Sequence, residues 1–211
     1  MGLDFEEFFD FWAQDPGNGL SEAVNVGLQH MPGQIEFVSW LGDDDVLSPS
    51  SLECTVKALR DNDRAVVAFG DAQYIDDTGK VFWTNHTGKW AVKLMRFGPN
   101  RIPQPGSLIR KSAMTDIGGL DSNLKWAMDL DMFIKLSKIG EFVYLKEVLA
   151  KYRWHSSSLS SSFAEKSLRE SSAVRLAHVP SPLKWAASVL EFLHVKLALA
   201  GTSRLDKMSK S

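Results

Sequence analysis

A chain of 211 residues with a net charge of −2 is long enough for one domain with a substantial core, or one domain with an appendage. This charge offers no basic footprint, so no nucleic acid partner is expected. The single cysteine, Cys54, excludes an internal disulfide framework and a cysteine-rich zinc site. The first residues are acidic, and no apolar run reaches the roughly 18 residues that a membrane span needs. These features favour a cytoplasmic protein.

Helices and strands are expected to alternate along the chain up to about residue 155, which indicates a layered α/β domain. The expected elements, in chain order, are a helix over 19–31, a strand over 35–41, a helix over 48–62, a strand over 65–75 with its hairpin return over 81–85, a helix over 88–98, a strand after the proline-rich loop within 101–111, a helix over 127–140, strands over 141–145 and 148–155, and helices over about 163–178 and 182–200. The serine-rich stretch 155–162 marks a change of composition. We therefore expect one domain over 1–160 and a helical extension with a polar tail over 161–211.

Three carboxylates, Asp43, Asp44 and Asp45, directly follow the apolar strand in the stretch FVSWLGDDDVLSP. Ligands of open α/β sheets bind outside the carboxyl ends of strands, and closely spaced carboxylate oxygens suit Mg²⁺ or Mn²⁺. The alternative is a solvated turn whose acids favour the N-terminus of the next helix.

Asp129 and Asp131 lie in an otherwise apolar helix, within WAMDLDMFIKL. Residues two apart do not share a helix face, so one carboxylate must point toward the core or a cleft. A carboxylate in a cleft can serve as a general base whose pKa is raised by burial. The alternative is one solvent-facing acid and one acid in the first helical turn.

Arg153 and His155 follow the last expected strand, in YRWHSSSLS. Arginine suits phosphate, and histidine suits a metal or a phosphate. The alternative is a strand end with ordinary surface residues.

Five segments occur in an order that is typical of a known family: DPGNGLSEAVNVGL, IEFVSWLGDDDVLSPSSL, IPQPGSLIRKSAMTDIGGLDSNL, WAMDLDMFIKL and YRWHSSSLS. Together they resemble glycosyltransferase family 2, the inverting nucleotide-sugar enzymes with the GT-A fold, over about residues 10–160. The resemblance implies a layered mixed sheet flanked by helices, followed here by the C-terminal helices. The family's first strand, helix and strand, which bind the nucleobase and ribose, are not found, so an N-terminally truncated GT-A-like fold with an exposed strand edge is expected.

The resemblance also implies roles for the acidic and basic residues. Asp44 and Asp45, with His155, would hold a divalent cation, either Mn²⁺ or Mg²⁺. Asp43 would contact the donor, and Arg153 and His155 would close over its diphosphate. Asp129 would be the general base that takes the proton of the acceptor hydroxyl. The residues implied on the acceptor side are Gln104, Gly106, Asp121, Trp126 and Asp131.

Two departures from the family's pattern occur near these residues. The glutamate that usually precedes the base is Met128 here, and the three consecutive acids allow two registers of the DxD motif. The function implied is metal-assisted transfer of a sugar, usually from a uridine diphosphate donor, to a saccharide or lipid-linked acceptor in polysaccharide biosynthesis. The alternatives are a catalytically silent binding module that lacks donor binding and a metal-dependent nucleotidyl- or phosphotransferase.

The last expected helix, 182–200, places Trp185 and basic residues among many leucines. Such a helix can lie on a membrane surface, which would place the protein peripherally at the inner face of the membrane. The alternative is a helix packed on the domain. Self-association through the exposed strand edge is a further expectation.

Overall fold

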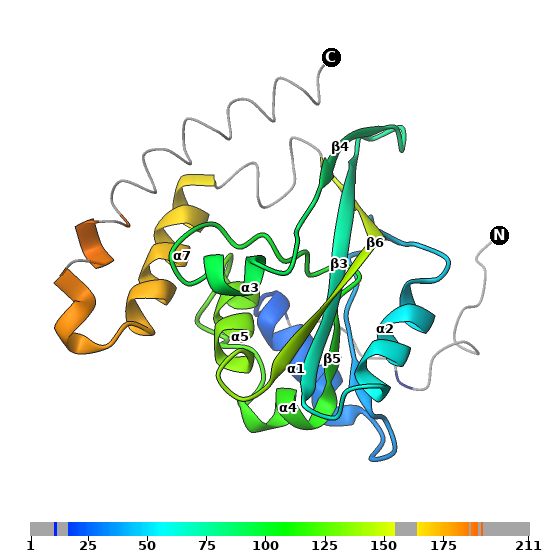
Figure 1. Ribbon diagram of the computed structural model, residues 1–211, viewed down its shortest axis with the longest axis horizontal. Coiled ribbons are helices and arrows are strands. Elements are labelled where there is room, and N and C mark those ends of the chain that lie inside the picture. The colour runs from blue at the N-terminus through cyan, green and yellow to red at the C-terminus, as the bar shows by residue number, and fades with distance from the viewer. Residues whose placement is uncertain (1–10, 12–16, 155–163, 186, 190, 192–211) are drawn as a thin grey trace.

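The computed structural model describes residues 11, 17–154, 164–185, 187–189 and 191 (Figure 1). Its helices are α1 (Leu20–His30), α2 (Ser51–Arg60), α3 (Ala91–Leu94), α4 (Lys111–Asp116), α5 (Met128–Leu136) and α7 (Ala164–Ala177), with a 3₁₀ turn, η2, at Ser181–Leu183. Its strands are β1 (Phe37–Val38), β2 (Val46–Leu47), β3 (Ala65–Ile75), β4 (Val81–Asn85), β5 (Leu108–Arg110) and β6 (Glu141–Arg153). The alternation of helices and strands expected from the sequence is therefore present.

The strands form one six-stranded mixed sheet in the order β1-β5-β3-β6-β2, and β4 pairs with β3. The central pair, β3 and β6, is parallel, whereas the other pairs are antiparallel. β3 changes its partner on one side, because Val67 and Ala68 pair with β5 while residues 72–75 pair with β4. The sheet therefore divides around Gly70 and Asp71, close to the middle of its longest ladder.

Helices cover both faces of this sheet, with α2 on one side and α5 and α7 on the other (Figure 1). The larger core cluster joins Phe69 of β3 to Phe133 and Leu136 of α5, all of which are fully buried. The smaller cluster joins Leu59 of α2 to Ala68 and its neighbours. Burial of apolar surface on both faces explains why β3 reads as a nearly continuous apolar run.

Several elements differ from the sequence-based expectation, and β2 and α4 are absent from it. The strand expected over 35–41 pairs only at Phe37 and Val38, and the helix expected over 88–98 is a single turn, α3. The two strands expected over 141–145 and 148–155 are one strand, β6. The polar residues 146–147, which lie between the two expected strands, belong to an irregular part of β6. This part of β6 packs closely against Gly70, where a methyl group would lie 2.7 Å from the Glu147 carbonyl oxygen.

α7, which lies in the predicted C-terminal extension, packs against α5. The Glu170 carboxylate accepts hydrogen bonds from the backbone N–H groups of Trp126 at 2.6 Å and Ala127 at 2.8 Å, and these residues lead into α5. The division of the chain at residue 160 stays a prediction. Within the described residues no helix combines the length and the hydropathy that a bilayer crossing requires.

Candidate functional site

The acidic stretch Asp43–Asp45 forms a tight turn, in which the Asp45 N–H donates to the Gly42 carbonyl oxygen at 3.3 Å. β2 follows at once and pairs with β6, with Val46 opposite Lys151. This register places the three acids beside the end of β6. The Arg153 backbone N–H donates to Asp45 Oδ1 at 3.0 Å, and Arg153 Nε donates to the Asp44 carbonyl oxygen at 3.2 Å. The structure thus brings together the acidic turn and the arginine, which the sequence separates widely.

Two carboxylates of this turn lie close to Gly42. A methyl group on Gly42 would lie 3.1 Å from Asp44 Oδ1 and 3.2 Å from Asp45 Oδ2, so both side chains border the same glycine. Burial raises the pKa of Asp45 to about 6, and the charges of Asp44 and Asp43 add to this effect, while Arg153 opposes it. Like charges held this close gain from a neutralising cation.

The donor set of the turn suits a hard divalent cation, because it consists of carboxylate oxygens. In the part of the chain that the structure describes, no three histidine, cysteine, aspartate or glutamate side chains gather so as to hold a metal ion on their own. Asp44 and Asp45 would therefore need further ligands to hold such a cation. His155, which the resemblance places with them, lies outside the described residues.

Asp129 lies in the first turn of α5 and is half-buried. Asp129 Oδ2 accepts a hydrogen bond from Asn100 Nδ2 at 3.0 Å, and Oδ1 accepts one from the Leu130 N–H at 2.7 Å. Burial raises the pKa of this carboxyl, although both hydrogen bonds favour its charged form. A carboxylate with a raised pKa is suited to accept a proton near neutral pH.

Aromatic rings lie side by side on the adjacent strands β4, β3 and β6. Tyr74 of β3 stands opposite Trp83 of β4 on one side and Tyr152 of β6 on the other, with ring centroids 4.7 and 5.3 Å apart. Burial raises the pKa of Tyr74, the neighbouring Tyr152 adds to this, and the charges of Asp45 and Asp129 raise it further. The charges of both carboxylates therefore act on the same phenol.

Comparison with known proteins identifies a family for part of the chain. Residues 13–115 match the family model described as Glycosyl transferase family 2, and this segment contains the acidic turn. This segment of the chain belongs to family 2 of the glycosyltransferases.

Relatives of this glycosyltransferase are recognisable over most of the chain. A protein of Rickettsia bellii described as an uncharacterized glycosyltransferase is 24% identical over 163 residues, which cover 74% of this chain and 23% of the relative. A similarly described protein of Rickettsia typhi is 25% identical over 162 residues, which cover 74% of this chain and 50% of the relative. The chondroitin synthase of Pasteurella multocida is 26% identical over 139 residues, which cover 63% of this chain and 14% of the relative. The chain thus spans half or less of these relatives.

The fold of this glycosyltransferase is of the GT-A type. The crystal structure of residues 1–349 of S. aureus TarS superposes with a TM-score of 0.51 at 16% sequence identity. The superposition covers 85% of this chain and 52% of that one. The fold expected from the sequence, a mixed sheet flanked by helices in the GT-A manner, is therefore confirmed.

Asp131, although only two residues from Asp129, faces a different part of the glycosyltransferase. Its buried carboxylate contacts His178 Nε2 at 2.8 Å and Lys135 Nζ at 2.7 Å. It therefore joins α5 to the residues that follow α7. The structure does not bring Asp131 to the acidic turn.

The remaining residues predicted on the acceptor side mostly make structural contacts. Gln104 Nε2 donates to the Trp40 carbonyl oxygen at 2.6 Å, two residues before the acidic turn begins at Gly42. Gly106 has φ +82°, and a methyl group there would lie 2.9 Å from Leu149 Cβ. Asp121 accepts hydrogen bonds from the N–H and side-chain amide of Asn123, each at 2.9 Å, which lower its pKa.

Trp126, the last of these predicted residues, is half-buried at the start of α5, where Glu170 accepts a hydrogen bond from its backbone N–H. Tyr74 and Asn100 are site residues that sequence reasoning missed. The pair Tyr152 and Trp154, which share one strand face because they are two apart, was a usable signal for an aromatic surface there.

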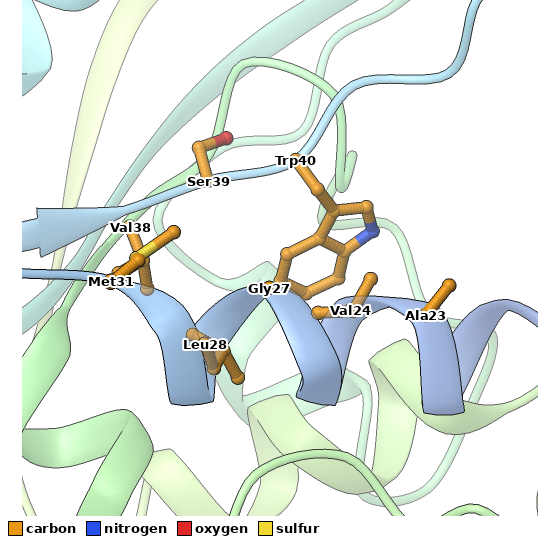
Figure 2. Close-up of a pocket in the computed structure, with 8 residues that line it drawn as sticks. All are labelled: Ala23, Val24, Gly27, Leu28, Met31, Val38, Ser39 and Trp40. Carbon is orange, nitrogen blue, oxygen red and sulfur yellow. The ribbon is translucent and has the colours of Figure 1, made fainter. Parts of the chain in front are cut away.

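An apolar pocket of about 280 Å³ adjoins the strand that leads into the acidic turn (Figure 2). It lies between α1 and β1. β1 is an edge strand of the sheet and pairs with β5. Figure 2 shows the Trp40 indole lying against α1 near Val24, whereas the Ser39 side chain points away from the helix. The pocket is separate from the acidic turn, because it lies on the helix side of the preceding strand.

Proposed function

We propose that the chain transfers a sugar, with inversion, from a nucleoside diphosphate donor, most simply a uridine diphosphate sugar, to a hydroxyl of a saccharide or lipid-linked acceptor. The half-buried Asp129 carboxylate, held by hydrogen bonds from Asn100 and the Leu130 N–H, carries this proposal, because inversion by direct displacement needs one base on the acceptor side. Polysaccharide biosynthesis on the cytoplasmic side of a membrane is the setting that the sequence predicts for it.

Asp129 serves as the base in this proposal. Its carboxylate takes the proton of the acceptor hydroxyl while that oxygen forms its bond to the anomeric carbon. The bond from the anomeric carbon to the diphosphate oxygen breaks at the same time, and the electron pair leaves with the nucleoside diphosphate. Asn100 and the Leu130 N–H hold the carboxylate in place through the hydrogen bonds described above.

Asp44 and Asp45 would hold the divalent cation, Mn²⁺ or Mg²⁺, whose positive charge stabilises the leaving diphosphate. Asp43, the most exposed of the three acids, is assigned to the donor's ribose or sugar. Arg153 orients the turn, because its N–H and Nε bind Asp45 and the Asp44 carbonyl oxygen. Its Nη1 also donates to the Asp76 carbonyl oxygen at 2.7 Å, so the guanidinium connects the acidic turn to the β3–β4 turn.

The aromatic cluster of Tyr74, Trp83, Tyr152 and Trp154 is the proposed support for a sugar ring. All four rings are half-buried, and each of the other three rings lies within 6.1 Å of Tyr74. Aromatic faces present broad apolar surface with a polar rim, which suits the apolar faces and hydroxyls of a saccharide.

Thermal unfolding of the purified chain with Mn²⁺ and a panel of nucleoside diphosphates tests the donor site. A ligand present at 100 times its Kd stabilises the native state by about 2.7 kcal/mol, or roughly 5–11 °C for a chain of this size. We expect such a shift with one nucleotide, dependent on the metal and lost in Asp44→Asn. Asp77→Asn, which changes an exposed acid of the β3–β4 turn, is the matched control and should keep the full shift. A shift that survives Asp44→Asn would refute the assignment, and no shift with any nucleotide would favour a silent binding module.

A further inference from the structure

An acid-free stretch runs through the middle of the sequence. Between Asp77 and Asp116 the chain has no aspartate or glutamate, although it has 26 such residues in total. The cations within this stretch are Lys80, Lys89, Lys93, Arg96, Arg101, Arg110 and Lys111. The local excess of positive charge is therefore large in a chain whose net charge is −2.

Within this stretch, α3 and its flanking residues expose an unusual set of side chains. The exposed large apolar residues are Trp90, Leu94 and Phe97, with Trp90 60% and Phe97 72% accessible to solvent. The other exposed side chains in the same nine residues are Lys89, Lys93 and Arg96. Outward-facing positions of a one-turn helix are normally polar, so three large apolar side chains there call for a partner.

Fixed contacts hold this segment on the domain. The Thr87 N–H donates to the buried Asp71 at 2.9 Å, and Thr87 Oγ1 donates to the Arg101 carbonyl oxygen at 3.1 Å. Ala91 and Met95 are buried in the core on the inner side of the helix. The exposed side chains are therefore presented by an anchored segment whose two ends are tied together.

A second segment with exposed apolar and basic side chains lies across a pocket from the first segment. This pocket, of about 320 Å³, is lined by Arg96 and Phe97 from the first segment and by Leu183 and Ala187 from the second. Around it the second segment exposes Leu183, Lys184, Trp185 and Val189, with Trp185 78% accessible. Figure 1 places this second segment beyond α7, on the side of the sheet opposite α2.

The carboxylates near this pocket are already paired with cations. Glu191 is buried and binds Arg175 through two contacts, at 2.5 and 2.8 Å. Asp131 is buried against His178 and Lys135. The exposed charges around the pocket, Lys138 included, are therefore positive.

We propose that these two segments form a docking face for the surface of a bilayer that contains anionic phospholipids. We call it the basic aromatic face, defined as the exposed side chains of 89–97, 183–185 and 187–189. Tryptophan and phenylalanine bury their rings at the boundary between head groups and acyl chains, and lysine and arginine remain at the level of the anionic head groups. Each cation near such a surface strengthens binding about fivefold, so several cations with a few buried rings give measurable affinity. The charge of the face selects an anionic partner, and the exposed apolar rings on both segments select a bilayer.

Vesicle flotation of the full chain tests this proposal. Vesicles of phosphatidylcholine alone are compared with vesicles in which phosphatidylglycerol replaces part of it. We expect flotation with the anionic vesicles, weaker flotation with the neutral ones, and release from the anionic vesicles by salt. The variant Trp90→Ser/Phe97→Ser should lose at least tenfold in vesicle affinity, and Lys93→Gln/Arg96→Gln should lose at least tenfold on anionic vesicles. The matched control, Leu52→Ser/Lys57→Gln, changes exposed residues of α2 and should bind like the unchanged chain.

Circular dichroism of every variant checks that the fold is intact, which these exposed positions should allow. The proposal is overturned if the folded chain stays unbound with anionic vesicles, or if the Trp90→Ser/Phe97→Ser variant binds them unchanged. Equal binding to neutral and anionic vesicles would remove the role of the cations and overturn it as stated. Self-association of the chain in solution that is lost in the same two variants, without vesicle binding, would identify a second copy as the partner instead.

Discussion

Asp129 and Asp131 offer a sharp test of the site, because they lie two residues apart on α5 and have different partners. Asp129 accepts hydrogen bonds from Asn100 and the Leu130 N–H, whereas Asp131 contacts His178 and Lys135. We expect Asp129→Asn to abolish most activity without a loss of stability, and Asp131→Asn to do the reverse. The comparison needs no assumption about the donor sugar beyond the presence of a measurable transfer reaction. It also controls for general effects of losing one negative charge from α5.

For Asp129→Asn, the magnitude follows from the role of a general base. Loss of such a base lowers kcat by about 10²–10⁴-fold, which corresponds to about 2.7–5.5 kcal/mol of transition-state stabilisation. The asparagine oxygen still accepts a hydrogen bond from Asn100 or from the Leu130 N–H. Burial raises the pKa of Asp129 in the folded state, so its ionised form costs stability at neutral pH, and the neutral side chain removes that cost. The melting temperature at pH 7.5 should therefore be unchanged or higher.

For Asp131→Asn, the loss falls on the contacts with His178 and Lys135. Hydrogen bonds to a charged group are worth about 1.5–3 kcal/mol. For a chain of this length that range lowers the melting temperature by roughly 3–12 °C. Its kcat should stay within a few-fold of the unchanged chain, because Asp131 does not face the acidic turn.

The assay measures sugar transfer from a panel of uridine diphosphate sugars to a mixed saccharide acceptor, together with melting curves of all three proteins. If Asp131→Asn loses activity while its fold is intact, and Asp129→Asn keeps it, the base has been assigned to the wrong residue. If Asp129→Asn unfolds the chain, its carboxylate has a structural role and the reasoning from its raised pKa fails.

Three further predictions concern pH, the backbone and a buried ion pair. Activity should rise with pH through the raised pKa of Asp129, so the acid limb of the kcat profile should lie above about pH 4, the value for an ordinary aspartate; a limb at or below that value contradicts the assignment. Gly106→Ala should lower the free energy of unfolding in urea by about 1–3 kcal/mol or more, because alanine at φ +82° is strained and its methyl group meets Leu149. A loss below about 0.5 kcal/mol would show that the loop adjusts freely. Arg175→Met leaves the buried Glu191 unpaired and should cost about 3–5 kcal/mol by the same measurement, whereas a neutral result would show that water reaches Glu191.

Local patterns in the sequence predict the elements of this fold well, because they reflect burial and turn chemistry. The apolar run before Asp43 and the apolar helix around Asp129 are both present where the sequence places them. The extent of β1 could not be predicted, since an apolar run indicates burial and not hydrogen-bonded pairing. The continuity of β6 past Glu147 depends on Gly70 of a different strand, and no local pattern contains that information.

The site is harder to predict than the fold for the same reason. The acids at 43–45 and Asp129 are identifiable as candidates from their residue types and their apolar surroundings. Their partners are not, because Asn100 and Tyr74 belong to other elements. The orientation of Asp131 is likewise set by His178, which lies 47 residues further along the chain. Pairings of this kind become visible once the sheet order is known.

The position of β6 late in the chain has a consequence for how the chain folds. The hydrogen bond from Arg153 to Asp45 joins residues 108 positions apart, and β2 enters the sheet only by pairing with β6. Contacts between distant residues form slowly, because a long loop must close before they repay its entropy. During synthesis, Asp45 of the acidic turn emerges 108 residues before Arg153, which positions it. Site assembly should therefore be among the last events of folding, and a nascent chain that has not yet reached residue 153 should have no donor site.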